Sequence, residues 1–258
     1  MAEITILGAY GTKGENHGTT SFALNETNVI DAGNILKGLT AKCADIETIW
    51  LTHSHLDHIA DIAFMLDFYF EKRKKPLRIA GLPETLYTIQ KHFLNELIWP
   101  DFSKIHLFDS KDKMAVEYFP IDLRKRYEIG KGEYLEAFKT NHTVPSCGYI
   151  VSKGERSIAI TSDTYCSDTI WDLVNSREDI KALIVECSFP SSYLELAKVS
   201  KHLTPELLES ELNKLNRDIA IYVNHLKPNS EDQIKKEFDH IAKLKAAVIL
   251  DDGDRINF

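Results

Sequence analysis

The sequence contains little cysteine, proline or glycine, and segments that mark several other protein classes are missing from it. Its 258 residues include 4 Cys, 8 Pro and 12 Gly. Four cysteines without a Cys-x-x-Cys pair are too few for a disulfide-stabilised scaffold of this length, so reduced thiols are expected. The first ten residues lack the basic start and the long apolar core of a secretion signal or membrane span. These absences predict a soluble cytoplasmic protein.

Composition and charge describe a globular chain. Hydrophobic residues make up 43% of the sequence, and 31 basic against 39 acidic side chains give a net charge of −8 with the 10 histidines counted neutral. The acidic balance argues against a nucleic-acid partner held mainly by phosphate contacts. No linker rich in proline, glycine or serine divides the chain, so a single domain over residues 1–258 is expected.

Runs of β-type residues alternate with helical periodicity along the whole chain. Strands are predicted at residues 3–7, 21–24, 28–31, 48–51, 77–80, 105–108, 157–161, 182–186, 219–223 and 246–250, and residues 114–151 are expected to be mostly β. Helices are predicted at residues 59–70, 83–97, 168–175, 204–215 and 230–243. Two β-rich halves with helices outside them predict an α/β fold of four layers, in which two sheets pack face to face.

The strongest chemical signal is the segment HSHLDH at residues 53–58, which follows a predicted strand and precedes a predicted helix. In an extended segment His53 and His55 point to the same side, and the first helical turn can direct Asp57 and His58 toward a neighbouring point. Imidazole nitrogens and carboxylate oxygens suit zinc, manganese or iron, and the lack of thiolates argues against a structural zinc site. One short segment can therefore supply ligands to two adjacent metal ions. The alternative interpretation is a polar surface turn that is rich in histidine.

Two metal ions need more ligands than one segment offers, and the later chain contains suitable residues at the ends of predicted strands. His142 follows the run at 136–139, Asp163 follows the run at 158–161, and His225 follows the run at 221–223. Loops at strand ends are where a rigid scaffold presents functional groups. For each residue alone an ordinary surface or core polar position is the better explanation, but their joint placement reverses this and favours a metal centre.

The HSHLDH segment followed by His142, Asp163 and His225 resembles the metallo-β-lactamase superfamily in its dinuclear hydrolase form. The resemblance covers essentially the whole chain and implies an αββα sandwich, two divalent metal ions and a metal-dependent hydrolase. It implies that the first ion binds His53, His55 and His142, that the second binds Asp57, His58 and His225, and that Asp163 bridges both.

Four local segments resemble one branch of that superfamily, the class II cyclic-nucleotide phosphodiesterases. They are Leu56 within the HSHLDH segment, GLPET at 81–85, IWPDF at 98–102 and HLTP at 202–205. This resemblance implies hydrolysis of 3′,5′-cyclic AMP or cyclic GMP to the 5′-monophosphate, with a small-molecule substrate and a possible homodimer as partners. Members of the family open with a Gly-rich segment, whereas Gly8, Gly11, Gly14 and Gly18 are spaced more loosely here, so nucleotide contacts from this segment are left open.

Two residues are assigned roles in proton transfer. His202 matches a histidine of the phosphodiesterase branch and is expected to donate a proton to the leaving oxygen. Asp57 is expected to accept a proton from the attacking water as well as to bind metal. Trp99, Phe102, Phe189 and Tyr193 are candidates for a wall that stacks on a base, with core packing as the alternative for each.

Three other functions stay open. The segment NHTVPSCGY at 141–149 resembles tRNase Z, an endonuclease of the tRNA 3′ end, although that enzyme carries Gly at the position of Leu56 and a tRNA-binding insertion that we do not find. A glyoxalase II-like thioester hydrolase would use the same metals with a different pocket. A nonhydrolytic metal-bound sensor would use the same scaffold without turnover.

Overall fold

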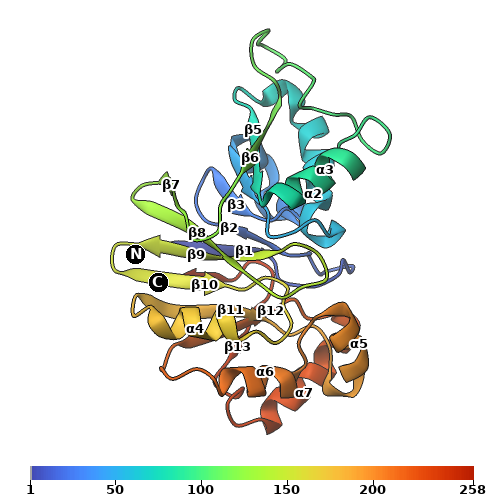
Figure 1. The fold of residues 1–258 in the computed structure, drawn as a ribbon. Helices are drawn as coiled ribbons and strands as arrows, with labels where there is room; N and C mark the ends of the chain where they lie inside the picture. Colours follow the sequence, from blue (N-terminus) through green and yellow to red (C-terminus); the bar gives the residue numbers. More distant parts are fainter. Residues whose placement is uncertain (1) are drawn as a thin grey trace.

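The computed structural model describes residues 2–258, in which two seven-stranded sheets pack face to face (Figure 1). The first sheet has the order β14-β1-β2-β3-β4-β5-β6. Its strands are β1 (Glu3–Gly8), β2 (Ser21–Ala23), β3 (Asn28–Ile30), β4 (Thr48–Trp50), β5 (Leu77–Gly81), β6 (Val116–Pro120) and β14 (Arg255–Asn257). The second sheet has the order β13-β12-β11-β10-β9-β8-β7. Its strands are β7 (Arg126–Gly130), β8 (Glu133–Lys139), β9 (Cys147–Lys153), β10 (Arg156–Ile160), β11 (Ile180–Glu186), β12 (Ala220–Asn224) and β13 (Val248–Ile249).

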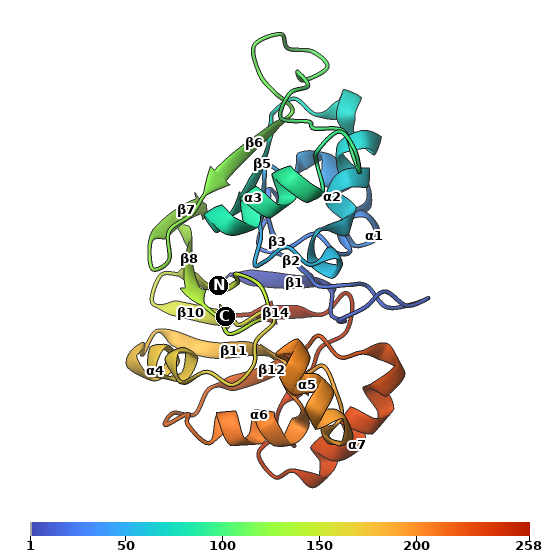
Figure 2. The same cartoon turned by 45° about the vertical axis from the view of Figure 1, so that its right-hand side comes forward.

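Helices cover the outer face of each sheet (Figures 1 and 2). Those on the first sheet are α1 (Ile35–Leu39), α2 (Leu56–Phe68) and α3 (Pro83–His92). Those on the second sheet are α4 (Asp168–Ser176), α5 (Leu194–Ser200), α6 (Pro205–Leu212) and α7 (Glu231–His240). The predicted four-layer αββα arrangement is therefore confirmed. Among residues 2–258, no helix combines the length and the apolar character that crossing a bilayer requires.

Two hydrophobic cores hold the layers together because successive side chains of a strand point to opposite faces. In β4, Ile49 belongs to the core under the first set of helices, and its neighbour Trp50 belongs to the core between the sheets. On α2 the apolar stripe that includes Ile62 and Leu66 is fully buried against the first sheet. The alternation in the strands and the stripe on the helix thus fix the position of α2 above β4.

The parallel parts of both sheets end on the side where the functional residues follow. Strands β3, β4, β5 and β6 are parallel to one another, and so are β10, β11, β12 and β13. Ligands of open α/β sheets bind outside the carboxyl ends of such strands. The loops after β4, β10 and β12 therefore converge on one region between the sheets.

One predicted strand is absent, and one predicted helix is present but shorter than expected. Residues 105–108 form no strand, and only an isolated bridge joins His106 to Met114. The predicted helix at 83–97 ends at His92, because the side chain of Asn95 accepts hydrogen bonds from the backbone N–H groups of Leu97 and Ile98 and so closes a turn. In residues 105–108, apolar side chains such as Leu107 are buried although the backbone forms a loop. Their sequence pattern therefore resembles that of a strand.

Candidate metal centre

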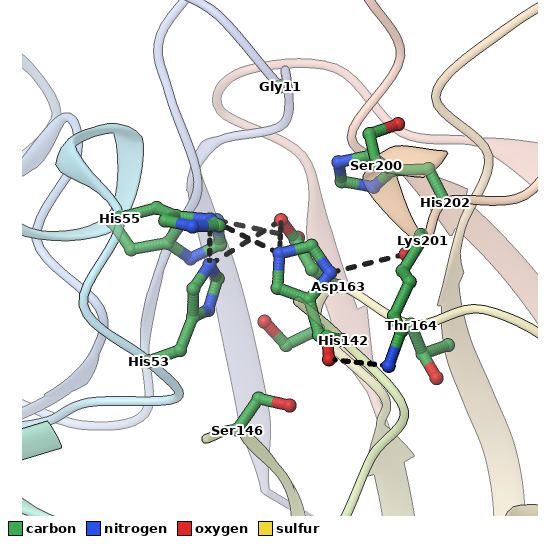
Figure 3. A network of polar contacts seen from close by, with 12 residues as sticks. Gly11, His53, His55, His142, Ser146, Asp163, Thr164, Ser200, Lys201 and His202 are labelled. Atoms are coloured by element: carbon green, nitrogen blue, oxygen red, sulfur yellow. Dashed lines mark hydrogen bonds and ion pairs between the residues drawn. The ribbon is translucent and has the colours of Figure 1, made fainter. Parts of the chain in front are cut away.

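The loops at the carboxyl ends of the strands bring all seven predicted ligands together. His53 comes three residues after β4, Asp163 three residues after β10, and His225 directly after β12. Helix α2 begins at Leu56, three residues before the predicted start, so that His55 is its N-cap residue and Asp57 lies in its first turn. The two sheets thus contribute residues to the same point, seen in Figure 3.

The first group consists of His53, His55, His142 and Asp163, whose nitrogen and oxygen atoms lie within 4.8 Å of one another. His55 Nδ1 is 3.0 Å from His53 Nε2 and 3.1 Å from His142 Nε2. Asp163 Oδ2 is 3.6 Å from His53 Nε2 and 3.7 Å from His142 Nε2. Three imidazole nitrogens and one carboxylate oxygen therefore surround one point.

The second group consists of Asp57, His58, Asp163 and His225. Asp163 Oδ1 is 3.1 Å from His225 Nε2 and 3.4 Å from His58 Nε2, and Asp57 Oδ2 is 3.4 Å from His225 Nε2. Asp163 thus directs one carboxylate oxygen to each group, which is the geometry required of a shared ligand.

Unpartnered polar atoms test whether these residues suit a metal ion. His58 Nε2, His225 Nε2 and Asp163 Oδ1 are buried and make no hydrogen bond within residues 2–258. A buried polar atom without a partner is costly, so a cluster of such atoms indicates a binding site for an ion. All three point into the second group, and their nitrogen and oxygen chemistry suits a divalent transition metal.

The electrostatic environment keeps the first group neutral and the bridging residue charged. Burial lowers the pKa of His142 to about 4 and lowers the pKa of His53 well below its ordinary value. Burial opposes ionisation of Asp163, but the neighbouring His225 and His58 outweigh it and hold the pKa of that carboxyl well below its usual range. Neutral imidazoles and an ionised carboxylate are the protonation states that bind metal.

Asp31, which the sequence interpretation missed, orients the second group from behind. It follows β3 and is fully buried. Its carboxylate accepts hydrogen bonds from the backbone N–H and the hydroxyl of Thr52, both 2.8 Å long, and lies 2.7 Å from His58 Nδ1. This contact fixes the proton of His58 on Nδ1 and leaves Nε2 free to bind a metal.

Glu186 is the second functional residue that the sequence interpretation missed, although a charged residue at the end of the buried strand β11 was a usable signal. Its carboxylate is fully buried and lies 2.7 Å from His202 Nδ1. It also accepts hydrogen bonds from the Ser188 hydroxyl (2.8 Å) and the backbone N–H of Thr164 (3.0 Å). Burial lowers the pKa of His202, but the charge of Glu186 more than compensates and the net shift is upward.

His202 lies beside both groups. Its ring stacks on that of His225, with centroids 5.3 Å apart, and its centroid is 5.1 Å from that of His142. Ser188 Oγ lies 3.2 Å from His202 Nδ1 and 2.9 Å from His225 Nδ1, so one hydroxyl links the two rings. His202 is therefore in contact with one histidine from each group.

Of the four aromatic residues predicted to form a stacking wall, Phe189 is the one in contact with the site, with its ring centroid 5.7 Å from that of His202. Trp99 packs edge-on against Phe64 of α2, and Phe102 is buried in the core under the helices. The side chain of Tyr193 is half exposed. Trp99 and Phe102 therefore serve core packing, which was the alternative for each.

The backbone around the centre is strained. Asp31, Ser162, Lys201 and His225 have φ angles of 55°, 55°, 55° and 66°, a conformation that L-residues rarely adopt. Gly11 lies against His225, and a Cβ atom built there would be 2.7 Å from His225 Nδ1. Absence of a side chain at position 11 is therefore a requirement of the site.

A cavity of about 790 Å³ opens beside His142. Its walls include the apolar residues Leu82, Pro83 and Ile121 and the polar residues Asn141 and Lys201. Cavities of this size accommodate small organic ligands.

The chain is similar to known proteins in sequence and in fold. The family model of the class-II cAMP phosphodiesterases matches residues 16–235. A 3′,5′-cyclic-nucleotide phosphodiesterase 1 from Saccharomyces cerevisiae is 28% identical over 214 residues, which cover 72% of this chain and 55% of that protein. A nuclear ribonuclease Z from Triticum aestivum is 30% identical over 107 residues, which cover 40% of this chain and 53% of that protein. The sequence matches thus span about half the length of these relatives.

Solved structures agree on the fold. Unliganded yeast PDE1 superposes with a TM-score of 0.81 and 21% identity, covering 100% of this chain and 99% of that chain. The metallo-β-lactamase fold protein YhfI from Bacillus subtilis superposes with a TM-score of 0.77 and 19% identity, covering 100% of both chains. Because the family model covers most of the sequence, we conclude that the chain has the metallo-β-lactamase fold and belongs to the class-II cAMP phosphodiesterase family.

Proposed function

We propose that this protein is a metal-dependent phosphodiesterase that hydrolyses 3′,5′-cyclic AMP or cyclic GMP to the 5′-monophosphate. The observation that carries the proposal is Asp163, which directs one oxygen to each of two groups of nitrogen and oxygen ligands. Family membership and the similarity to a cyclic-nucleotide phosphodiesterase support the substrate class.

In this proposal His53, His55 and His142 bind one divalent ion, Asp57, His58 and His225 bind a second, and Asp163 binds both. Zinc is the expected metal, with manganese or iron as alternatives. Bound divalent ions lower the pKa of water and stabilise the charge that develops on phosphate oxygens.

The remaining chemistry is assigned to the protein's own side chains. The carboxylate of Glu186 stabilises the protonated His202 ring through Nδ1, so that Nε2–H donates to the departing ribose oxygen. Asp57 is assigned as the acceptor of a proton from the attacking water, because it is an ionised carboxylate of the second group, with Oδ2 3.4 Å from His225 Nε2, and its side chain is 24% exposed. The cavity beside His142 has room for the nucleoside.

The test is a substrate panel on metal-reconstituted protein: cyclic AMP, cyclic GMP, a pre-tRNA and a glutathione thioester. We expect hydrolysis of a cyclic nucleotide that disappears when the metal is removed by a chelator and returns when zinc is added. Full activity of metal-stripped protein would refute the dinuclear mechanism. Cleavage of pre-tRNA alone would favour the ribonuclease Z alternative, which the 30% identity over 107 residues keeps in the comparison.

The assignment of His202 has its own test. His202→Ala should lower kcat by about 10²- to 10⁴-fold, the range typical of a lost acid catalyst, while the bound metal stays near the wild-type amount. His92→Ala removes an exposed histidine at the end of α3 and is the matched control. Equal losses of metal and of kcat in His202→Ala would make His202 a support of the ligands rather than the acid.

Location and assembly stay predictions. The four cysteines are unpaired, which is compatible with the predicted cytoplasmic location. Sedimentation measures whether the chain forms the homodimer that the family resemblance implies.

A further inference from the structure

Lys201 connects helix α5 to His202 in a conformation that is unusual for lysine. It is the residue after the last turn of α5, with φ 55° and ψ 55°. Glycine is the common residue at this position of a helix end, because the left-handed conformation brings the Cβ atom of other residues too close to the backbone. Nonglycine residues persist in such a conformation where the surrounding structure holds them, often at functional sites.

The contacts of Lys201 show why a side chain is present there. Its ammonium group donates to the carbonyl oxygen of His142 at 3.1 Å (Figure 3). It also donates to Oδ1 of Asn141 at 3.1 Å. Its own carbonyl oxygen lies 3.2 Å from Nδ1 of His142. One residue of the second half of the chain therefore holds the backbone and the ring of His142, which lies 59 residues earlier.

These contacts act on the atom that faces the first group. The carbonyl of Lys201 fixes the His142 proton on Nδ1 and leaves Nε2 free, and Nε2 is the atom 3.1 Å from His55 Nδ1. The ammonium group binds two acceptors of the loop that carries His142, the Asn141 side chain and the His142 carbonyl oxygen. These two hydrogen bonds together restrict rotation of the loop. Lys201 is half buried and has no carboxylate partner within residues 2–258, so its charge is directed to this loop.

We infer that Lys201 is a positioning residue, whose ammonium group holds His142 in the orientation that binds the first metal ion and ties that ligand to the backbone of His202. The inference rests on the proposed role of His142 as a metal ligand. The left-handed conformation of Lys201 then has a function. It lets one residue direct its carbonyl oxygen to the His142 ring and its ammonium group to the loop that carries His142.

The informative variant is Lys201→Gly. Glycine adopts the left-handed conformation without strain, so the carbonyl stays in place while the ammonium is lost. We expect the metal-stripped variant to melt at or above the wild-type temperature, whereas one of the two zinc-binding steps in calorimetric titration weakens about 10-fold or more. Lys201→Arg, which keeps a cationic donor, should restore most of the affinity. Lys198→Met on α5 removes an exposed lysine that contacts Glu195 and should bind zinc as the wild type does.

The outcomes separate the inference from the proposed function. Wild-type zinc affinities at both steps in Lys201→Gly would overturn the positioning role. A large fall in the melting temperature of the metal-stripped variant would also overturn it, because the side chain would then support the fold rather than the ring. Wild-type protein that binds no zinc would refute the proposed metal centre itself, and the role of Lys201 with it.

Discussion

Replacing Gly11 by alanine should perturb the proposed metal centre without changing any of its candidate ligands. A Cβ atom at position 11 would lie 2.7 Å from Nδ1 and Cε1 of the His225 ring and 2.8 Å from the His225 carbonyl oxygen. The ring cannot rotate away freely, because it is 1% exposed and its Nδ1 lies 2.9 Å from the hydroxyl of Ser188. The added methyl group must therefore move either the ring or the strand end that carries it.

The size of the effect follows from these distances. Ordinary carbon contacts begin at 3.4 Å, so the ring must retreat by about 0.7 Å. Zinc–nitrogen bonds tolerate deviations of about 0.2 Å, and a shift of this size withdraws His225 from the second group. We expect zinc binding at one step to weaken about 10- to 100-fold, equivalent to about 1.4 to 2.8 kcal/mol. Overpacking should lower the free energy of unfolding by about 1 to 3 kcal/mol, or the melting temperature by roughly 2 to 12 °C.

Calorimetric titration of zinc into metal-stripped protein and a thermal melt measure the two effects. Gly14→Ala is the control, because the nearest atom to a Cβ at that position is Nδ1 of His17, whose side chain is 29% exposed and can swing into solvent. The control should bind zinc as the wild type does. Two unchanged zinc-binding steps in Gly11→Ala would refute the claim that the close approach of this loop sets the position of His225.

Two further predictions use other parts of the structure. Asp31→Asn should weaken zinc binding about 10- to 100-fold at one step, because Asp31 accepts at both oxygens, at Oδ1 from the Thr52 backbone N–H and at Oδ2 from the Thr52 hydroxyl and His58 Nδ1, and an amide N–H₂ group cannot accept at either position. Unchanged affinity would show that His58 keeps its tautomer without the carboxylate. Hydrogen bonds from Arg177 lower the pKa of Asp179 to about 2, so this ionised carboxylate adds stability that is fully present above its unfolded pKa near 3.8 and is lost as the pH falls toward 2. In metal-stripped protein, Asp179→Asn should therefore melt below the wild type at pH 7, by an amount that corresponds to less than about 1 kcal/mol. This difference in melting temperature should narrow below about pH 4. A difference that does not change with pH would exclude the ionised carboxylate as its cause.

The candidate ligands that the structure brings together were predictable from the sequence because four of them share one six-residue segment. His53, His55, Asp57 and His58 combine a metal-binding composition with a strand before them and a helix after them, and an ordinary polar turn rarely has both features. Asp163 and His225 could be added because they end strands that the apolar runs define. The four layers followed from the alternation of the same runs with amphipathic helices.

The residues that orient the ligands could not be predicted in this way. Asp31 and Glu186 are single acidic residues at strand ends, and their function depends on contacts with His58 and His202 that only the packed sheets create. Helix α5 is short and has no side-chain cap, so no local pattern indicates it. The strand wrongly predicted at 105–108 shows the reverse problem, a local pattern without the expected element. Its apolar residues pack in the core although the backbone there forms a loop.

The left-handed backbone of Asp31, Ser162, Lys201 and His225 limits how stable this protein can become. Conformations of this kind cost about 1 to 3 kcal/mol each, while the whole free energy of unfolding of a domain is only about 5 to 15 kcal/mol. Selection for heat resistance alone would therefore find gains by letting the loops that carry these four residues reorder, and at Lys201 also by substitution with glycine. Such gains would loosen the ligands, so a thermostable descendant of this protein is expected to trade catalytic rate for melting temperature unless its stabilising changes lie away from the strand ends.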